Sequence, residues 1–149
     1  MTQTIHPRKT RQSILKTDFT PISPVEWGRT EGPKTGALVL AGGGDLRGTG
    51  ILEKFLTLAG GNSARIVAIP TAGTDAVAPL GQDFDGTELA AMFLDYGAAE
   101  VDVLHTRDPH KADQSEFAAP LMNATGVWFT GGRQWRLVDA YAETATLGA

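Results

Sequence analysis

From about residue 36, short apolar runs alternate with stretches in which apolar residues recur every three or four positions. Continuous apolar runs are typical of strands covered on both faces, and the three-to-four spacing indicates helices. The pattern therefore predicts strands at 37–41, 65–69, 101–104 and 126–129. It predicts helices at about 51–59, 89–96, 117–124 and 137–141, the third of which contains Pro120.

Strands and helices that alternate in this order predict βαβ units, and therefore a parallel sheet with helices on both faces. In sheets of this kind, ligands bind beyond the carboxyl ends of the strands. Four segments follow the predicted strands, namely 42–45, 70–75, 105–108 and 131–134. We expect the functional residues to lie in these segments.

The first 35 residues differ in character from the rest. They contain four prolines and little periodicity, which predicts an irregular or disordered leader at 1–35 before a folded domain at 36–149. The leader holds six Lys or Arg against three Asp or Glu, and the remainder holds seven against fourteen, so +3 and −7 give the net charge of −4. An acidic folded part disfavours nucleic acid as a partner, and the basic leader is more simply a solvated tail than a contact to an anionic surface.

Composition narrows the class of protein further. Hydrophobic residues make up 42% of the chain, which is enough for a core. The absence of cysteine excludes disulfides, thiolate catalysis and Cys-based metal sites, and it fits a cytoplasmic location. No apolar run approaches the roughly 20 residues of a membrane span, so no membrane partner is expected. The 18 glycines gather at the ends of apolar runs, where they favour tight turns.

The glycine-rich segment at 42–50, GGGDLRGTG, fails the tests for two phosphate-binding motifs. The dinucleotide fingerprint needs a third glycine where Arg47 stands, and a P-loop needs a lysine where Thr49 stands. Helix packing is the preferred role of these glycines, with a phosphate site as the alternative. The nearest match to a nucleophile elbow, at 61–65, lacks its last glycine and precedes a strand, so it is interpreted as a loop.

Histidines and clustered carboxylates give no metal site by spacing. The histidines at 6, 105 and 110 do not have the spacing of metal ligands, and His105, at a predicted strand end, is interpreted as structural or surface-exposed with a catalytic role as the alternative. The acidic residues Asp83, Asp85 and Glu88 indicate a helix N-terminus, with a cation site as the alternative. No metal and no organic cofactor is expected.

Five segments occur in an order that resembles a known family: LVLAGGGD, ILEKFLTLAGG, ARIVAIPTAG, AAEVDVLHTRD and GVWFTGGRQWRL. They are similar to the amino-terminal half of the cyanophycinase-like serine peptidases, the S51 peptidase family, over residues 36–147. The resemblance implies an α/β fold: a three-layer αβα sandwich with a mostly parallel sheet, flavodoxin-like and related to class I glutamine amidotransferases, here truncated. It also implies a peptide substrate containing aspartate, such as cyanophycin, and a homodimer as an assembly to test.

The resemblance also assigns roles to the residues after the fourth predicted strand. Gly131 and Gly132 correspond to a glycine pair that helps to form the oxyanion hole, and Gln134 to a glutamine that positions the nucleophile or the substrate. Backbone N–H groups at a strand end can stabilise a developing oxyanion, and glycine permits close approach. The alternative is that the pair forms only a tight turn between strand and helix.

Two departures from the family pattern affect the expected activity. Arg133 stands where the family commonly has an acidic or amide residue. The serine elbow, Gly-Thr-Ser-Ala-Gly in the family, is expected one helix further along and is not found in residues 1–149, nor are its histidine and acidic partners. Without a nucleophile and base we expect no turnover from these residues alone. The rival from another class is a non-catalytic doubly wound module that binds a nucleotide or anion at 42–48.

Overall fold

The computed structural model describes residues 35–73 and 84–149. The chain divides into two units, Met1–Gly36 and Ala37–Ala149, and the elements below belong to the second. The leader predicted at 1–35 lies outside the described residues apart from Thr35.

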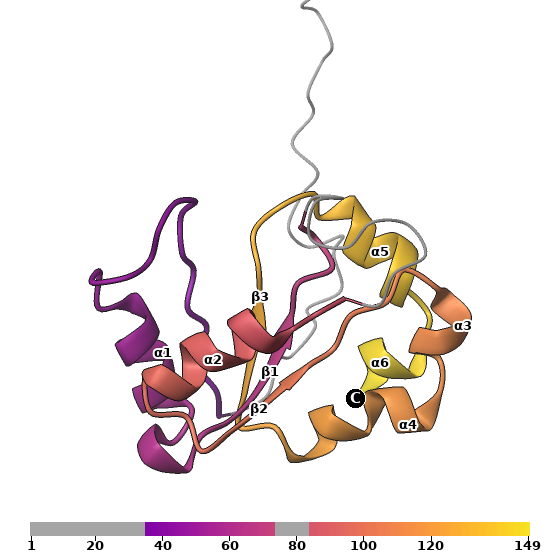
Figure 1. Ribbon diagram of the computed structural model, residues 1–149. Coiled ribbons are helices and arrows are strands. Elements are labelled where there is room, and N and C mark those ends of the chain that lie inside the picture. Colours follow the sequence, from indigo (N-terminus) through magenta and orange to yellow (C-terminus); the bar gives the residue numbers. More distant parts are fainter. Residues whose placement is uncertain (1–34, 74–83) are drawn as a thin grey trace, which may run out of the picture. The chain divides into compact units, whose positions relative to one another are not determined.

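A three-stranded parallel sheet forms the centre of the second unit (Figure 1). It consists of β1 (Arg65–Ile69), β2 (Glu100–Val103) and β3 (Gly126–Phe129), in the order β2-β1-β3. Arg65 of β1 pairs with Glu100, and Ile66 pairs with Gly126. This order is the first part of the 2-1-3 arrangement of flavodoxin-like sheets. The predicted α/β fold with a parallel sheet is therefore confirmed.

Helices cover both faces of the sheet, and the alternation of side chains along β1 shows why. Ile66 and Ala68 belong to the core beneath α1 (Ile51–Leu58) and α2 (Thr87–Asp95). Val67 and Ile69 point to the opposite face and pack with residues from α3 (Pro109–Ala112) and α5 (Trp135–Tyr141). Figure 1 shows α1 and α2 on one side of the strands and the remaining helices on the other. A strand buried on both faces explains the continuous apolar run at 65–69.

The remaining elements are short. They are η1 (Gly61–Ser63), α4 (Ser115–Ala118), η3 (Ala119–Asn123) and α6 (Ala145–Gly148). The helix predicted at about 117–124 is divided into α4 and the 3₁₀ helix η3, and Pro120 lies in the first turn of η3. The sequence did not predict α3 or α6, because a four-residue helix is too short to show periodicity.

Three aromatic rings from three elements fill the core on the α1/α2 side. The centroid of Trp128 in β3 lies 5.0 Å from that of Phe55 and 5.8 Å from that of Phe93, and both pairs are edge-on. The first residue of β3, Gly126, leaves room for this packing, since a Cβ there would lie 2.9 Å from the Cβ of Ala59 and 3.0 Å from Cζ of Phe55. The contacts fix β3, and hence the turn that follows it, against α1.

The strand predicted at 37–41 is wrong. The structure has no strand in this segment, and Leu38 and Leu40 are 84% and 85% exposed. Only Val39 packs against the α1/α2 core. A strand with a continuous apolar run is normally covered on both faces. Of the side chains at 38–40, the described residues cover only that of Val39. The segment instead leads as irregular chain into the glycine-rich residues 42–44.

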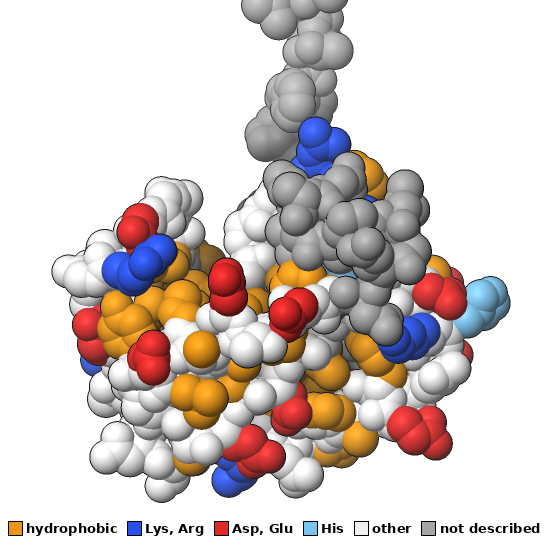
Figure 2. Space-filling model, viewed as in Figure 1, with side chains coloured by type: hydrophobic (Ala, Val, Ile, Leu, Met, Phe, Trp, Pro, Cys, Tyr) orange, Lys and Arg blue, Asp and Glu red, His pale blue; other side chains and the backbone are white. Residues whose placement is uncertain are grey.

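The described helices are all too short or too polar to cross a membrane. On the face drawn in Figure 2, apolar side chains over α1 and α2 lie between acidic and basic ones. Leu58 and Leu94, on these two helices, are about half exposed.

Candidate functional site

A cleft of about 710 Å³ lies beyond the carboxyl end of β3. One wall is the segment from β3 to α5, and the other is the glycine-rich chain before α1. Side chains from α1, α2 and β3 form the floor. The lining residues are Ala41, Gly42, Gly43, Gly44, Asp45, Leu46, Arg47, Leu52, Leu89, Met92, Trp128, Phe129, Thr130, Gly131, Gly132 and Gln134. Two of the four segments expected to hold functional residues, 42–45 and 131–134, therefore meet at one cleft.

The two outer amides of the turn after β3 donate to carbonyl groups of β1 and of the turn that follows β1. Thr130 N–H donates to the carbonyl of Ile69 at 3.2 Å, and Arg133 N–H donates to the carbonyl of Ala72 at 2.7 Å. Within the described part of the chain, neither Gly131 nor Gly132 donates a backbone hydrogen bond. Both glycines are exposed and line the cleft. Backbone N–H groups that have no acceptor among the described residues can bind an anionic or carbonyl oxygen.

Gly132 cannot be replaced by another residue without strain. Its φ is 145°, a region that side chains with a Cβ rarely adopt. A Cβ built at this position would overlap the carbonyl group of Ala72 and lie 2.9 Å from the nitrogen of Gly73. A Cβ at Gly131, in contrast, would meet no atom of the described residues within 4 Å. The second glycine is therefore required by the close approach of the turn after β1.

Gln134 is the N-cap residue of α5 and lines the same cleft. Its carbonyl oxygen accepts the Leu137 amide at 2.9 Å, so the backbone is fixed at the helix start. The side chain is exposed, and its amide can both donate and accept. Arg133, the departure from the family pattern, is exposed but does not line the cleft.

The opposite wall is held by local hydrogen bonds. The Asp45 carboxylate accepts from the backbone amide of Arg47 at 3.0 Å and from its Nε at 3.2 Å. The backbone bond is the largest cause that lowers the pKa of Asp45, and the guanidinium bond acts in the same direction. The Asp45 carboxylate and the Arg47 guanidinium thus lie at the rim of the cleft, beside the glycines at 42–44. A Cβ added to any of these glycines would meet no atom of the described residues within 4 Å.

The other two strand ends also come together, behind the turn rather than in the cleft. Thr71, which follows β1, lies with its Oγ1 3.0 Å from Nδ1 of His105 and 2.6 Å from the hydroxyl of Tyr141. Thr71 is completely buried, and Tyr141 is 5% exposed. Burial raises the pKa of Tyr141, and hydrogen bonding with Thr71 and Thr106 reduces this increase. These three side chains link β1, the end of β2 and α5.

His105 is half-buried and stays neutral more readily than a free histidine. Desolvation is the main cause that lowers its pKa, and the positive charges of Arg107 and Lys111 lower it further. Its ring packs edge-on against Phe84 at 5.1 Å between centroids. The structure therefore favours the structural interpretation of His105, since its Nδ1 is bonded to a buried hydroxyl.

The remaining candidates lie away from the cleft. Ser63 ends the 3₁₀ helix η1 before β1 rather than after it, so the segment at 61–65 is a short connection that runs into β1 and no nucleophile elbow. Ser115 begins α4. Asp85 accepts the Thr87 amide at 2.9 Å at the start of α2, as a helix N-terminus requires, and Asp83 lies outside the described residues. In the described ranges, no three His, Asp or Glu residues come together to hold a metal ion.

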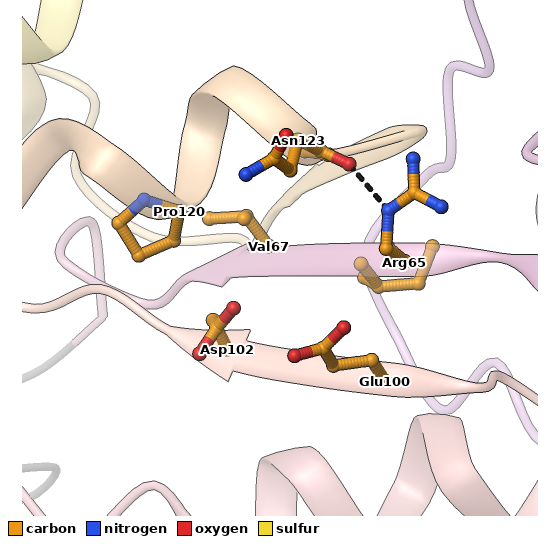
Figure 3. Close-up of a pocket in the computed structure, with 8 residues that line it drawn as sticks. Arg65, Val67, Glu100, Asp102, Pro120 and Asn123 are labelled. Atoms are coloured by element: carbon orange, nitrogen blue, oxygen red, sulfur yellow. Dashed lines mark hydrogen bonds between the residues drawn. The ribbon is translucent and has the colours of Figure 1, made fainter.

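A smaller cavity of about 230 Å³ lies over the first residues of β1 and β2 and contains none of the predicted site residues (Figure 3). Arg65 Nε donates to the carbonyl of Asn123 at 2.7 Å and ties η3 to β1. Glu100 and Asp102 of β2 line the same cavity and are exposed. These contacts anchor the amino end of the sheet.

Sequence reasoning missed two features of this site. Thr71 was part of a segment expected to be functional, but nothing in the sequence paired it with Tyr141, which was predicted only as an apolar residue of the last helix. The carbonyl of Ala72 also has no sequence signal, because any residue supplies a carbonyl. Its role could have been suspected only from the glycine required opposite it.

Comparison with known proteins identifies the family. The profile of peptidase family S51 matches residues 38–149, which include both walls of the cleft. The chain belongs to peptidase family S51. Two of the segments that resembled this family in the sequence, LVLAGGGD and FTGGRQ, contribute residues to the two walls of the cleft.

Curated S51 relatives are much longer than this chain. A cyanophycinase of Synechococcus elongatus is 39% identical over 113 residues, which are 74% of this chain and 33% of the relative. A cyanophycinase of Trichormus variabilis is 31% identical over 115 residues, 76% of this chain and 37% of the relative. A cyanophycinase of Geminocystis herdmanii is 30% identical over 112 residues, which are 74% of this chain and 39% of the relative. The chain thus spans little more than a third of the length of these relatives.

Proposed function

We propose that this chain forms the amino-terminal part of a cyanophycinase-like serine peptidase that hydrolyses aspartate-containing peptides such as cyanophycin. The observation that carries the proposal is the pair of exposed glycines Gly131 and Gly132, which line the cleft and whose amides donate to no acceptor in the described residues. The S51 match and the relatives named cyanophycinase support the substrate class.

In the proposed mechanism, a serine hydroxyl attacks the carbonyl carbon of the scissile peptide bond while a histidine accepts its proton. The carbonyl oxygen becomes an oxyanion, and the N–H groups of Gly131 and Gly132 donate to it. When the C–N bond breaks, the histidine gives the proton to the leaving amine. Removal of one such donor typically raises the barrier by about 3 to 4 kcal/mol. Gln134 would hold the nucleophile or the substrate from the helix start.

The nucleophile and base are assigned to a part of the polypeptide outside these 149 residues. Neither Ser63 nor Ser115 lines the cleft, and Ser13 and Ser23 lie outside the described residues. None of the four stands in a Gly-x-Ser-x-Gly elbow. Residues 1–149 are therefore expected to bind the peptide without cleaving it.

Two measurements on the 149-residue chain test this proposal. An aspartyl peptide titrated into ¹⁵N-labelled protein is expected to shift the amide resonances of Gly131, Gly132 and Gln134, and an amino-group release assay is expected to show no hydrolysis. A peptide of the same length with alanine in place of aspartate is the control. Equal shifts with both peptides would contradict the substrate class, and measurable hydrolysis would contradict the missing nucleophile.

The rival function is separated by the same titration with a nucleotide. Shifts and thermal stabilisation by ATP, without any by the aspartyl peptide, would favour an anion-binding module at 42–48. The proposal also includes a cytoplasmic location and a homodimer. Sedimentation of a single 15.8 kDa species across the micromolar range would contradict the homodimer.

A further inference from the structure

Behind the cleft, a turn of four residues supports the glycine pair directly. The Gly73 amide donates to the carbonyl of Pro70 at 2.8 Å and closes the turn that follows β1. The carbonyl of Ala72, within this turn, accepts the Arg133 amide at 2.7 Å. Because the Arg133 nitrogen belongs to the peptide group that follows Gly132, this bond sets the orientation of the backbone at the second glycine.

The side chain adjacent to that carbonyl is fixed from two sides. Thr71 Oγ1 lies 2.6 Å from the Tyr141 hydroxyl and 3.0 Å from Nδ1 of His105. No part of Thr71 is exposed, so a substrate cannot reach its hydroxyl. This buried threonine therefore cannot act as a nucleophile, although it contacts a histidine. What it can do is hold the turn in place.

One arrangement of the hydroxyl protons satisfies both contacts of Thr71, although either oxygen of the Thr71–Tyr141 pair can be the donor. In this arrangement the Tyr141 hydroxyl donates to Thr71 Oγ1, 2.6 Å away. Thr71 then donates its own proton to Nδ1 of a neutral His105. This arrangement gives every hydroxyl proton an acceptor within the network. Loss of the central hydroxyl would leave two buried or half-buried partners unsatisfied, which costs more than a single net hydrogen bond.

We propose that Thr71 is a positioning residue for the cleft, and that its hydroxyl, held between Tyr141 and His105, fixes the turn whose Ala72 carbonyl orients the Gly132–Arg133 peptide. The inference rests on the proposed function where it concerns substrate. The geometric part, that Thr71 controls the backbone at Gly132, stands on the contacts alone.

The geometric part is tested by amide hydrogen exchange of the 149-residue chain without ligand. In T71V, exchange at the Arg133 amide is expected to rise about tenfold or more while the β1 amides keep their rates. T71S, which retains the hydroxyl, is expected to match the wild type. T146V is the matched control, because Thr146 is also buried and donates to the carbonyl of Ala112 at 2.6 Å, but in α6.

Two results would overturn the inference. One is unchanged exchange at Arg133 in T71V. The other is an equal rise at all amides, since this would show a general loss of stability. Y141F retains the ring and removes one bond to Thr71, so it serves if T71V does not fold. It is expected to raise exchange at Arg133 by a smaller factor than T71V, and no rise would count against the proposal.

Titration with the aspartyl peptide separates this inference from the proposed function. If the wild type binds, T71V is expected to bind several-fold more weakly and T71S equally well. Equal binding by T71V would overturn the role of Thr71 in the cleft. If the wild type does not bind, the proposed function fails, and the exchange result still decides whether Thr71 positions the turn.

Discussion

The α-carbon of Gly132 lies against the carbonyl group of Ala72, so closely that a Cβ on the glycine would overlap it. The next amide, that of Arg133, donates to the same carbonyl at 2.7 Å. The turn after β1 and the turn after β3 are thus joined by a contact that only glycine allows. This contact places Gly131 and Gly132 at the edge of the cleft.

Replacing Gly132 by alanine is expected to destabilise the protein by about 2 kcal/mol or more, because of both the positive φ and the overlap with Ala72. The matched variant is G131A, where a Cβ meets no atom of the described residues within 4 Å and the change is expected to stay within about 0.5 kcal/mol. Urea denaturation followed by circular dichroism measures both. Equal losses in the two variants would show that the contact is not specific to the second glycine.

The pH dependence of stability is expected to reflect His105. Its folded-state pKa lies below the ordinary value of 6.5, since burial and the charges of Arg107 and Lys111 disfavour the imidazolium. As the pH falls through 6.5 the unfolded chain therefore binds a proton before the folded one does, and the free energy of unfolding decreases. A separate cavity of about 440 Å³ is lined by His105 and Lys111 together with Glu116, whose charge is of the opposite sign.

This effect is measured by urea denaturation between pH 5.5 and 7.5. As the pH is lowered, the urea concentration at the unfolding midpoint is expected to decrease in the wild type and to decrease less in H105Q. Met122, which does not titrate and is 72% exposed, supplies the control variant M122Q, which should keep the wild-type slope. A slope that H105Q leaves unchanged would assign the pH dependence to other groups.

The aromatic cluster beneath α2 is expected to carry a large share of the stability. Phe93 is completely buried and contacts both Phe55 and Trp128. F93A should therefore cost about 3 to 5 kcal/mol through lost burial and the cavity it leaves. The adjacent Leu94 is 48% exposed, and L94A should cost less than about 1 kcal/mol. Thermal unfolding distinguishes them, and similar midpoints would contradict the packing described.

Most of the fold could be predicted from the sequence, and particular residues show where this stops. The apolar run of β1 is continuous because helices cover both of its faces, and the predicted bounds of this strand, 65–69, agree with the structure. The strand order could not be predicted, because the pairing of Ile66 with Gly126 joins residues far apart in the chain. At the site, the glycine pair was visible in the sequence. The Thr71–Tyr141 bond, across a separation of 70 residues, was not.

The segment at 37–41 offers a test where sequence and structure disagree. If the segment were a buried strand, replacing Leu38 or Leu40 by serine would lower the free energy of unfolding by about 2 to 5 kcal/mol. Because these side chains are 84% and 85% exposed, each replacement is expected to lower it by no more than about 0.5 kcal/mol. Val39 packs against the α1/α2 core, so V39S should cost more than either leucine variant. Urea denaturation of the three single variants decides the matter. A larger loss in L38S or L40S than in V39S would mean that this segment is covered on the face that the structure leaves open.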